Sequence, residues 1–158
     1  DIPFITIPDM HSGIYPTCSQ TLSKQGAGSQ LGKYIPENSL MVSCIGTAGL
    51  VCISETLCQT NQQINSIICK KGISSFYVFL TLKGMEAYLK RLGAGGSTTL
   101  NISKSLFSSI KIKIPNKKEM ELFENKISPI FDSILVNEKE IAKLQELRMI
   151  IISGISRK

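Results

Sequence analysis

The sequence predicts a mixed α/β (α+β) fold, in which a globular domain with a twisted β-sheet, residues 1–115, precedes a long coiled-coil-forming helix, residues 116–158. Two patterns support this fold class. Short runs rich in β-branched residues and bounded by Gly and Asn are typical of strands, and they occupy residues 41–45, 50–53 and 64–68. From residue 116 onwards, apolar residues recur every three or four positions, which is the period of a helix.

Composition and charge narrow the class of protein. Hydrophobic residues make up 42% and charged residues 19% of the chain, as in an ordinary globular protein. No run of about 18 apolar residues occurs, so we expect no membrane association through a transmembrane helix. The net charge of +6 is compatible with a polyanionic partner. The chain opens without a signal-peptide pattern, and we expect either a fragment of a longer protein or a half-length subunit.

The five cysteines and the single histidine, His11, give no pattern of zinc ligands, because no C-x-x-C pair is present. Cys44 and Cys52 lie inside apolar runs, which indicates reduced core thiols and a cytoplasmic protein. We therefore expect no metal and no cofactor. The sequence also lacks a G-x-G-x-x-G nucleotide-binding motif and the Asn/Asp-Pro-Pro-aromatic motif of methyltransferases, and we expect no catalytic residues.

In chain order, the first expected elements are a short strand at residues 5–7 and a Gly-, Ser- and Gln-rich surface loop at residues 20–32. Gly46 and Gly49 then free the backbone for a tight turn between the first two long strands. The spacing of apolar residues predicts one helix over residues 74–92. Ser103 is a candidate helix cap, and residues 111–114 alternate polar and apolar like a half-buried strand.

Polar residues in four loops or turns are the candidates for contact with a nucleic acid, since lysines bind phosphates while amides and hydroxyls bind base edges. For each position a purely structural role is equally open, and Asn61 is interpreted as a turn former. The candidates are Lys24, Lys33, Tyr34, Thr47, Gln62, Gln63, Ser97, Thr98 and Lys104.

The C-terminal helix carries an apolar stripe in alternating three- and four-residue steps, which is typical of a coiled coil. Some 40 residues would extend about 60 Å, so we expect the stripe to pack on something outside the domain. The alternative is that the helix folds back onto its own domain, with Pro129 as a kink or a break. We call the following residues the seam: Phe123, Ile127, Ile130, Ile134, Asn137, Ile141, Leu144, Arg148 and Ile151, with Met120 and Ile155 at its ends.

Several segments, in this order, resemble the specificity subunit of type I restriction–modification systems: ITIPDM at 5–10, IGTAG at 45–49, TNQQ at 60–63, GGST at 95–98, NISKSL at 101–106, IKIP at 112–115 and IAKLQELR at 141–148. The likeness covers one target recognition domain and one spacer helix. The family usually has two of each and opens with an aromatic-led segment, which is absent here. Met120 also stands where a Gln is common in the family.

This resemblance implies a non-catalytic subunit that reads a sequence in double-stranded DNA. By the same resemblance, the partners are methyltransferase (modification) subunits and, indirectly, the restriction subunit. The family pairs its two spacer helices antiparallel, so if the chain is not fused to a second half, the resemblance implies an antiparallel homodimer through the C-terminal helix. The alternative function is an oligomeric scaffold that does not bind DNA.

Overall fold

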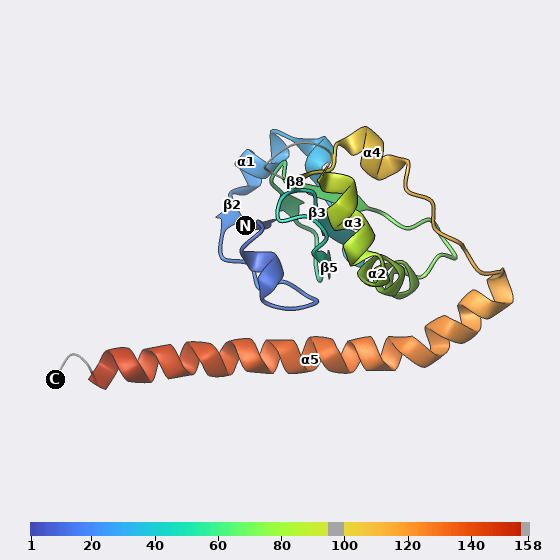
Figure 1. Ribbon diagram of the computed structural model, residues 1–158. Coiled ribbons are helices and arrows are strands. Elements are labelled where there is room, and N and C mark those ends of the chain that lie inside the picture. Colours follow the sequence, from blue (N-terminus) through green and yellow to red (C-terminus); the bar gives the residue numbers. More distant parts are fainter. Residues whose placement is uncertain (95–99, 156–158) are drawn as a thin grey trace.

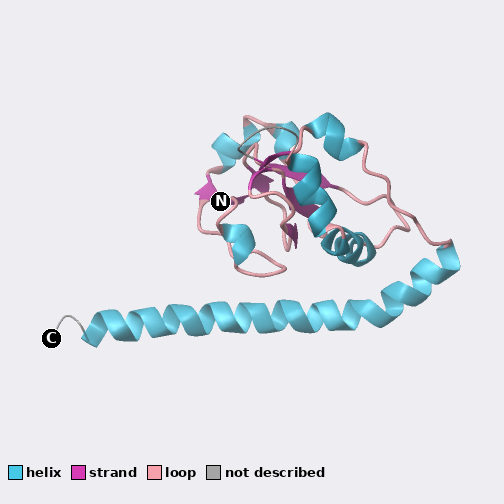
Figure 2. Ribbon diagram, in the orientation of Figure 1, coloured by secondary structure: helices cyan, strands magenta, loops and turns pink. Residues whose placement is uncertain are grey.

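The computed structural model describes residues 1–94 and 100–155, and in it a globular part of short strands and small helices lies beside one long helix (Figures 1 and 2). In the described part, no helix is long and apolar enough to cross a membrane. The elements in chain order are β1 (Ile2–Ile5), η1 (Asp9–His11), β2 (Thr21–Leu22), α1 (Lys24–Gly28), η2 (Leu31–Lys33), β3 (Leu40–Ser43), β4 (Ile45–Gly46), β5 (Val51–Ile53), β6 (Gln59–Thr60), β7 (Ile64–Ile67), α2 (Ser75–Gly84), α3 (Glu86–Gly93), β8 (Leu100–Asn101), α4 (Lys104–Ser108) and α5 (Lys117–Ile155).

The central sheet has the strand order β5-β3-β7, and both pairings of β3 are antiparallel. It contains the three expected β-branched runs, so this part of the sequence prediction is confirmed. Every residue of β3 is buried, because helix α2 covers one face of the sheet and the N-terminal segment covers the other. Gly46 and Gly49 have φ angles of 79° and 95°, which a residue with a side chain rarely adopts. The expected tight turn is therefore present.

Two smaller sheets flank the central one, with strand orders β2-β1-β6 and β4-β8. β1 begins at Ile2 and ends at Ile5, so the strand expected at residues 5–7 lies several residues earlier. The reason is that Thr6 already turns: its backbone N–H and its hydroxyl both donate to the carboxylate of Asp9, at 2.8 and 2.7 Å.

Three other expectations from the sequence are wrong. The single helix over 74–92 is two helices, α2 and α3, separated at Met85. Residues 111–114 form no strand, and no strand in the described part of the chain pairs with them. Residues 20–32 lie on the surface as expected but are not a loop: they are folded into β2, α1 and η2, and the buried amide of Gln59 donates to the carbonyl of Ala27 at 2.9 Å to hold them.

Helix α5 starts with a reciprocal cap that fixes its first turn. The side chain of Asn116 accepts the N–H of Glu119 at 3.0 Å, and the side chain of Glu119 accepts the N–H of Asn116 at 3.1 Å. Pro129 lies inside the helix without ending it. Figure 1 shows that the first turns of α5 bend relative to the rest, and a proline inside a helix is a common cause of such a bend.

The first half of α5 packs on its own domain. The ring of Phe131, which is 3% exposed, stacks on Phe76 at 4.3 Å and meets Phe79 edge-on at 5.6 Å. Three seam residues, Phe123, Ile127 and Ile134, also pack against this core. The expectation that the whole stripe packs outside the domain is therefore wrong for its first half, where the fold-back alternative is realised without a break.

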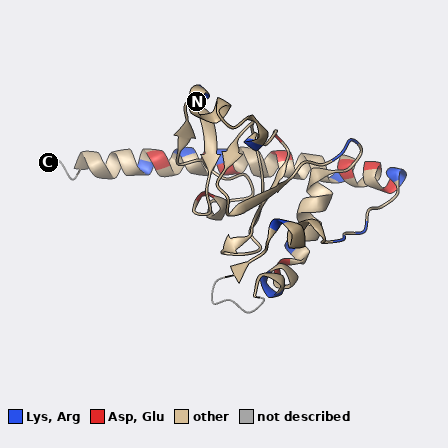
Figure 3. Ribbon diagram, turned by 90° about the horizontal axis from the view of Figure 1, so that it is seen from above, with Lys and Arg blue, Asp and Glu red and all other residues tan. Residues whose placement is uncertain are grey.

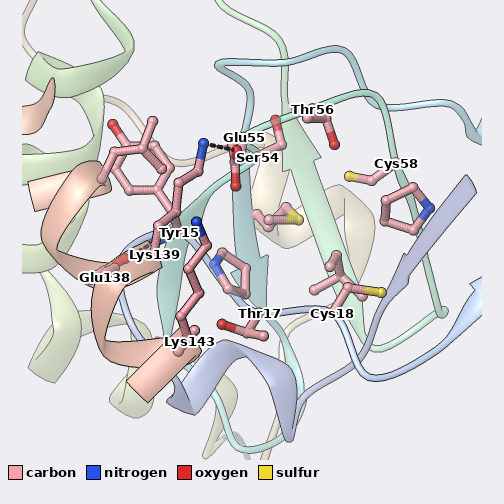
Figure 4. Close-up of a pocket in the computed structure, with 16 residues that line it drawn as sticks. Tyr15, Thr17, Cys18, Ser54, Glu55, Thr56, Cys58, Glu138, Lys139 and Lys143 are labelled. Carbon is pink, nitrogen blue, oxygen red and sulfur yellow. Dashed lines mark hydrogen bonds and ion pairs between the residues drawn. The ribbon is translucent and has the colours of Figure 1, made fainter. Parts of the chain in front are cut away.

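Polar contacts fix the middle of α5 against the N-terminal segment. The carboxylate of Glu138 accepts the backbone N–H groups of Ile14 and Tyr15 at 2.8 and 2.9 Å. Lys139 forms an ion pair with Glu55, across a cavity of about 420 Å³ between α5 and the domain (Figure 4). Burial, together with the nearby carboxylates of α5 and Glu55, raises the pKa of Tyr15 to about 12.

Gly13 allows this close approach, because a Cβ there would lie 2.6–2.8 Å from the carboxylate of Glu138. In the variant Gly13→Ala, Glu138 must withdraw and lose its hydrogen bonds, so we expect a loss of roughly 1–3 kcal/mol in the free energy of unfolding. Gly84→Ala is the matched control, since nothing lies within 4 Å of that position. Denaturant unfolding measures both variants, and equal effects would contradict the role assigned to Gly13.

Candidate nucleic-acid interface

A groove of about 590 Å³ brings together residues from three separate parts of the chain. Lys33 and Tyr34 come from the end of η2, Gln62 from the loop before β7, and Lys104 from the start of α4. Four of the candidate DNA-contact residues therefore share one concave surface, although they are up to 71 positions apart in the sequence.

The pairing of β4 with β8 forms part of the lining of this groove. Ile45 pairs with Asn101 in this two-stranded sheet, and the next residue, Ile102, donates its N–H to the carbonyl of Cys44 at 2.8 Å. Ser103 then caps α4, because its hydroxyl accepts the N–H of Leu106 at 3.2 Å. The cap predicted from the sequence is confirmed, and it places exposed Lys104 at the first position of the helix, on the groove wall.

The amides at 61–63 have different roles. The Asn61 side chain donates to the side-chain oxygen of Gln63 at 3.1 Å and accepts the backbone N–H of Gln63 at 3.0 Å. Asn61 thus shapes the turn, as interpreted from the sequence. The side-chain nitrogen of Gln63 lies near Gly46, and its oxygen is already engaged by Asn61. Gln62 is exposed and lines the groove, so it is the amide best placed to meet a ligand.

Three other candidates, Lys24, Thr47 and Gln63, lie outside the lining of this groove. Lys24 is exposed at the start of α1, and Thr47 is half-buried in the glycine turn after β4. Ser97 and Thr98 lie outside the described residues. The sequence analysis missed further polar lining residues, of which Asn101 and Ser103 directly precede Lys104 and could have been included with it.

The net positive charge of the globular part favours the binding of an anion. Residues 1–116 contain ten Lys and Arg against five Asp and Glu, whereas α5 contains six against seven. Figure 3 shows this contrast as acidic segments concentrated along α5. Two of the five carboxylates are held in ion pairs, Glu55 with Lys139 and Glu86 with Lys90. Among the described residues that line the groove, the charged ones are two lysines.

The cysteines are free thiols, and three of the five are buried. Burial raises the pKa of Cys52 to about 12 and that of Cys58 to about 11, so both remain protonated near neutral pH. Cys44, on the groove floor, accepts a hydrogen bond from the Asn65 amide at 3.1 Å. In the described part of the chain, no group of three or more His, Cys, Asp or Glu residues is placed to hold a metal ion.

Solved structures share this fold. One is a chain from a study of the assembly and conformational transition of a type I restriction–modification system, with a TM-score of 0.60, 15% identity, and coverage of 92% of this chain and 34% of that one. Another is the HsdS subunit of Thermoanaerobacter tengcongensis, with a TM-score of 0.57, 16% identity, and coverage of 91% and 32%.

The sequence comparisons give the family. The model of the type I restriction modification DNA specificity domain matches residues 1–148, and the chain belongs to this family, as the resemblance implied. It is 44% identical over 155 residues to the specificity subunit of the type I restriction enzyme HindI of Haemophilus influenzae, covering 96% of this chain. The MjaIX specificity subunit of Methanocaldococcus jannaschii is 28% identical over 92% of this chain. The chain spans about a third of the length of each relative, 34%.

Proposed function

We propose that this chain recognises a DNA sequence as part of a type I specificity subunit, and that the groove lined by Lys33, Tyr34, Gln62 and Lys104 contacts the duplex. The observation that carries the proposal is the convergence of these residues on one concave, cationic surface in a member of this family. Residues 1–115 would be the target recognition domain and residues 116–158 the spacer.

The lining residues supply the two kinds of contact that sequence recognition needs. The ammonium groups of Lys33 and Lys104 would bind phosphates and so set the position of the duplex. The exposed amide of Gln62 can donate and accept at once, which suits the paired donor and acceptor of an adenine edge. Gln63, oriented by Asn61, and Thr47 stand beside the groove as further candidates, and Lys24 would contact phosphate from α1.

The subunit would perform no chemistry itself. It would position methyltransferase subunits, and through them the restriction subunit, at the sequence that it binds. We place it in the cytoplasm, because five free cysteines are typical of a reducing compartment.

Alanine variants of the groove residues test the proposal. Lys33→Ala and Lys104→Ala should weaken binding to all sequences alike, and each should lower the slope of log affinity against log salt by about 1. Gln62→Ala should change the sequence preference, with a loss of roughly 1–3 kcal/mol of discrimination at one base pair. Selection from a random duplex library, followed by titration at several salt concentrations, measures both properties.

Lys126→Ala is the matched control for charge, since Lys126 is exposed on α5 and does not line the groove. Equal effects of Lys126→Ala and of the two groove variants would remove the groove from the proposal. Absence of salt-sensitive DNA affinity in the unaltered chain would favour the alternative function, a scaffold that does not bind DNA.

We also propose an antiparallel homodimer through the seam, favoured by the seam residues that its own domain leaves exposed. Five apolar seam residues are between 53% and 70% exposed: Ile130, Ile141, Leu144, Ile151 and Ile155. At about 1.5–3 kcal/mol for full burial of each side chain, covering these half-exposed residues would contribute roughly 4–8 kcal/mol per chain.

Sedimentation of the 158-residue chain at tens of micromolar tests the homodimer. We expect a dimer, and we expect Ile141→Asp to dissociate it, because the charge would be buried in the pair without a partner. Ile134→Asp is less informative, since Ile134 also packs on the domain core. A monomer whose sedimentation does not change in Ile141→Asp would rule the pairing out.

A further inference from the structure

The outer edge of the central sheet has no partner strand in the described part of the chain. Strand β7 pairs with β3 on one side only. Just before this pairing, the N–H of Cys44 donates to the carbonyl of Gln63 at 2.8 Å. Hydrogen-bonded pairs alternate along antiparallel strands, so the backbone of Ser66, three residues further on, faces away from β3. Its N–H and C=O groups are therefore available to a further strand.

A second stretch of backbone without a partner strand lies beside this edge. A groove of about 520 Å³, which we call the edge groove, is lined by residues 65–68 and by the isoleucines at 110, 112 and 114. Figure 1 shows both segments running toward the end of the domain at which α5 starts. The N–H groups of residues 111–114 donate to no backbone group that the structure describes. The hydroxyl of Tyr77 donates to the carbonyl of Lys113 at 2.8 Å and so holds this segment on α2.

The floor of the edge groove is apolar. Val78 and Leu82 of α2 line it and are 3% and 2% exposed. Ile110 and Ile112 are partly buried and pack against the same core. An apolar side chain that entered the groove would extend this core, so a ligand of the edge groove should carry apolar side chains.

The charge around the edge groove is positive. Of the residues described in its lining, the charged ones are Lys70 and Lys104. Lys104 also lines the proposed DNA groove, as do Asn65 and Ser66, so the two grooves meet at the edge of β7. Successive side chains of a strand point to opposite faces of its sheet. On a strand added to β7, one set of side chains would lie over α2, and the other set would lie on the face of the sheet that borders the DNA groove.

From these observations we propose that the edge groove binds an extended segment of a partner protein, in which apolar and acidic residues alternate, as an additional strand on the outer edge of β7. Main-chain hydrogen bonds to Ser66 supply the attachment, as in other cases of strand addition. The apolar side chains pack on Val78 and Leu82, and the carboxylates meet Lys104.

The bound segment would also exclude DNA from part of the proposed DNA groove, because its carboxylates neutralise Lys104, which both grooves share. This consequence rests on the function proposed above, whereas the addition of the strand does not. The site would thus let a partner protein lower the affinity for DNA.

A defined peptide tests the strand addition in the absence of DNA. The probe is a labelled seven-residue peptide in which Glu and Val alternate, with Glu at both ends, and fluorescence anisotropy with the 158-residue chain measures its dissociation constant. One control peptide has Lys in place of every Glu, and the other has every backbone amide methylated. We expect each control to bind at least tenfold more weakly. Equal binding of the methylated peptide would overturn strand addition, and equal binding of the Lys peptide would overturn the preference for an acidic segment.

A pair of variants at one position tests the role of β7. Ser66→Pro removes the N–H that faces the edge groove, whereas Ser66→Ala keeps it. Proline is tolerated on an edge strand where its N–H would face away from the sheet, and thermal unfolding checks that both variants fold. We expect Ser66→Pro to raise the dissociation constant of the Glu–Val peptide at least tenfold and Ser66→Ala to raise it less than threefold. Equal effects in two folded variants would overturn the pairing with β7.

Two measurements on the unaltered chain complete the test. The bound peptide should slow hydrogen exchange of the Ser66 amide, and an unchanged rate at saturation would overturn the proposed strand even if Ser66→Pro does not fold. The same peptide, at saturation, should weaken binding of a DNA duplex at least tenfold. An unchanged affinity for DNA would overturn the exclusion of DNA and leave the added strand intact, whereas a chain that binds the peptide but no DNA would overturn the proposed function alone.

Discussion

The attachment of α5 to its own domain is the interaction on which the rest of the structure depends. Phe131 fills the space between Phe76 and Phe79, and the Glu138 carboxylate holds two backbone N–H groups of the N-terminal segment. Because the helix is continuous, fixing residues 120–142 also fixes the direction of residues 143–155. A long helix that would otherwise be a flexible appendage becomes a rigid extension of the globular part.

Because α5 is held rigidly on its domain, the groove has a fixed position relative to any partner that α5 binds. The groove lies on loops that the buried strand β3 and the β4–β8 pair hold in place, while α2 joins the same core to α5. The function proposed for this chain requires that the groove be held at a fixed angle to the partners of α5. In this chain the same hydrophobic core supports both the groove and the helix, so their relative orientation follows from packing and does not need a separate linker.

The sequence was informative where local chemistry decides the structure and misleading where tertiary contacts decide it. The β-branched runs, the glycine turn and the Ser103 cap could be predicted, because each depends on residues close in the chain. The seam was visible too, but periodicity cannot say whether a stripe meets its own domain or another chain. For this reason the sequence analysis missed that Phe131 and Glu138 contact the domain. Both residues lie one position along the chain from residues of the seam. Residues 111–114 alternate like a strand, yet none of the strands that the structure describes pairs with them.

Hydrogen exchange along α5, measured at several protein concentrations, tests most directly whether this helix is shared between its own domain and a partner. Backbone amides at residues 120–142 should exchange as slowly as those of β3 at every concentration, because the domain itself holds them. Amides at residues 143–155 should be protected only at concentrations at which the chain dimerises. Slow exchange along the whole helix at high dilution, or rapid exchange in its first half, would contradict this division of α5.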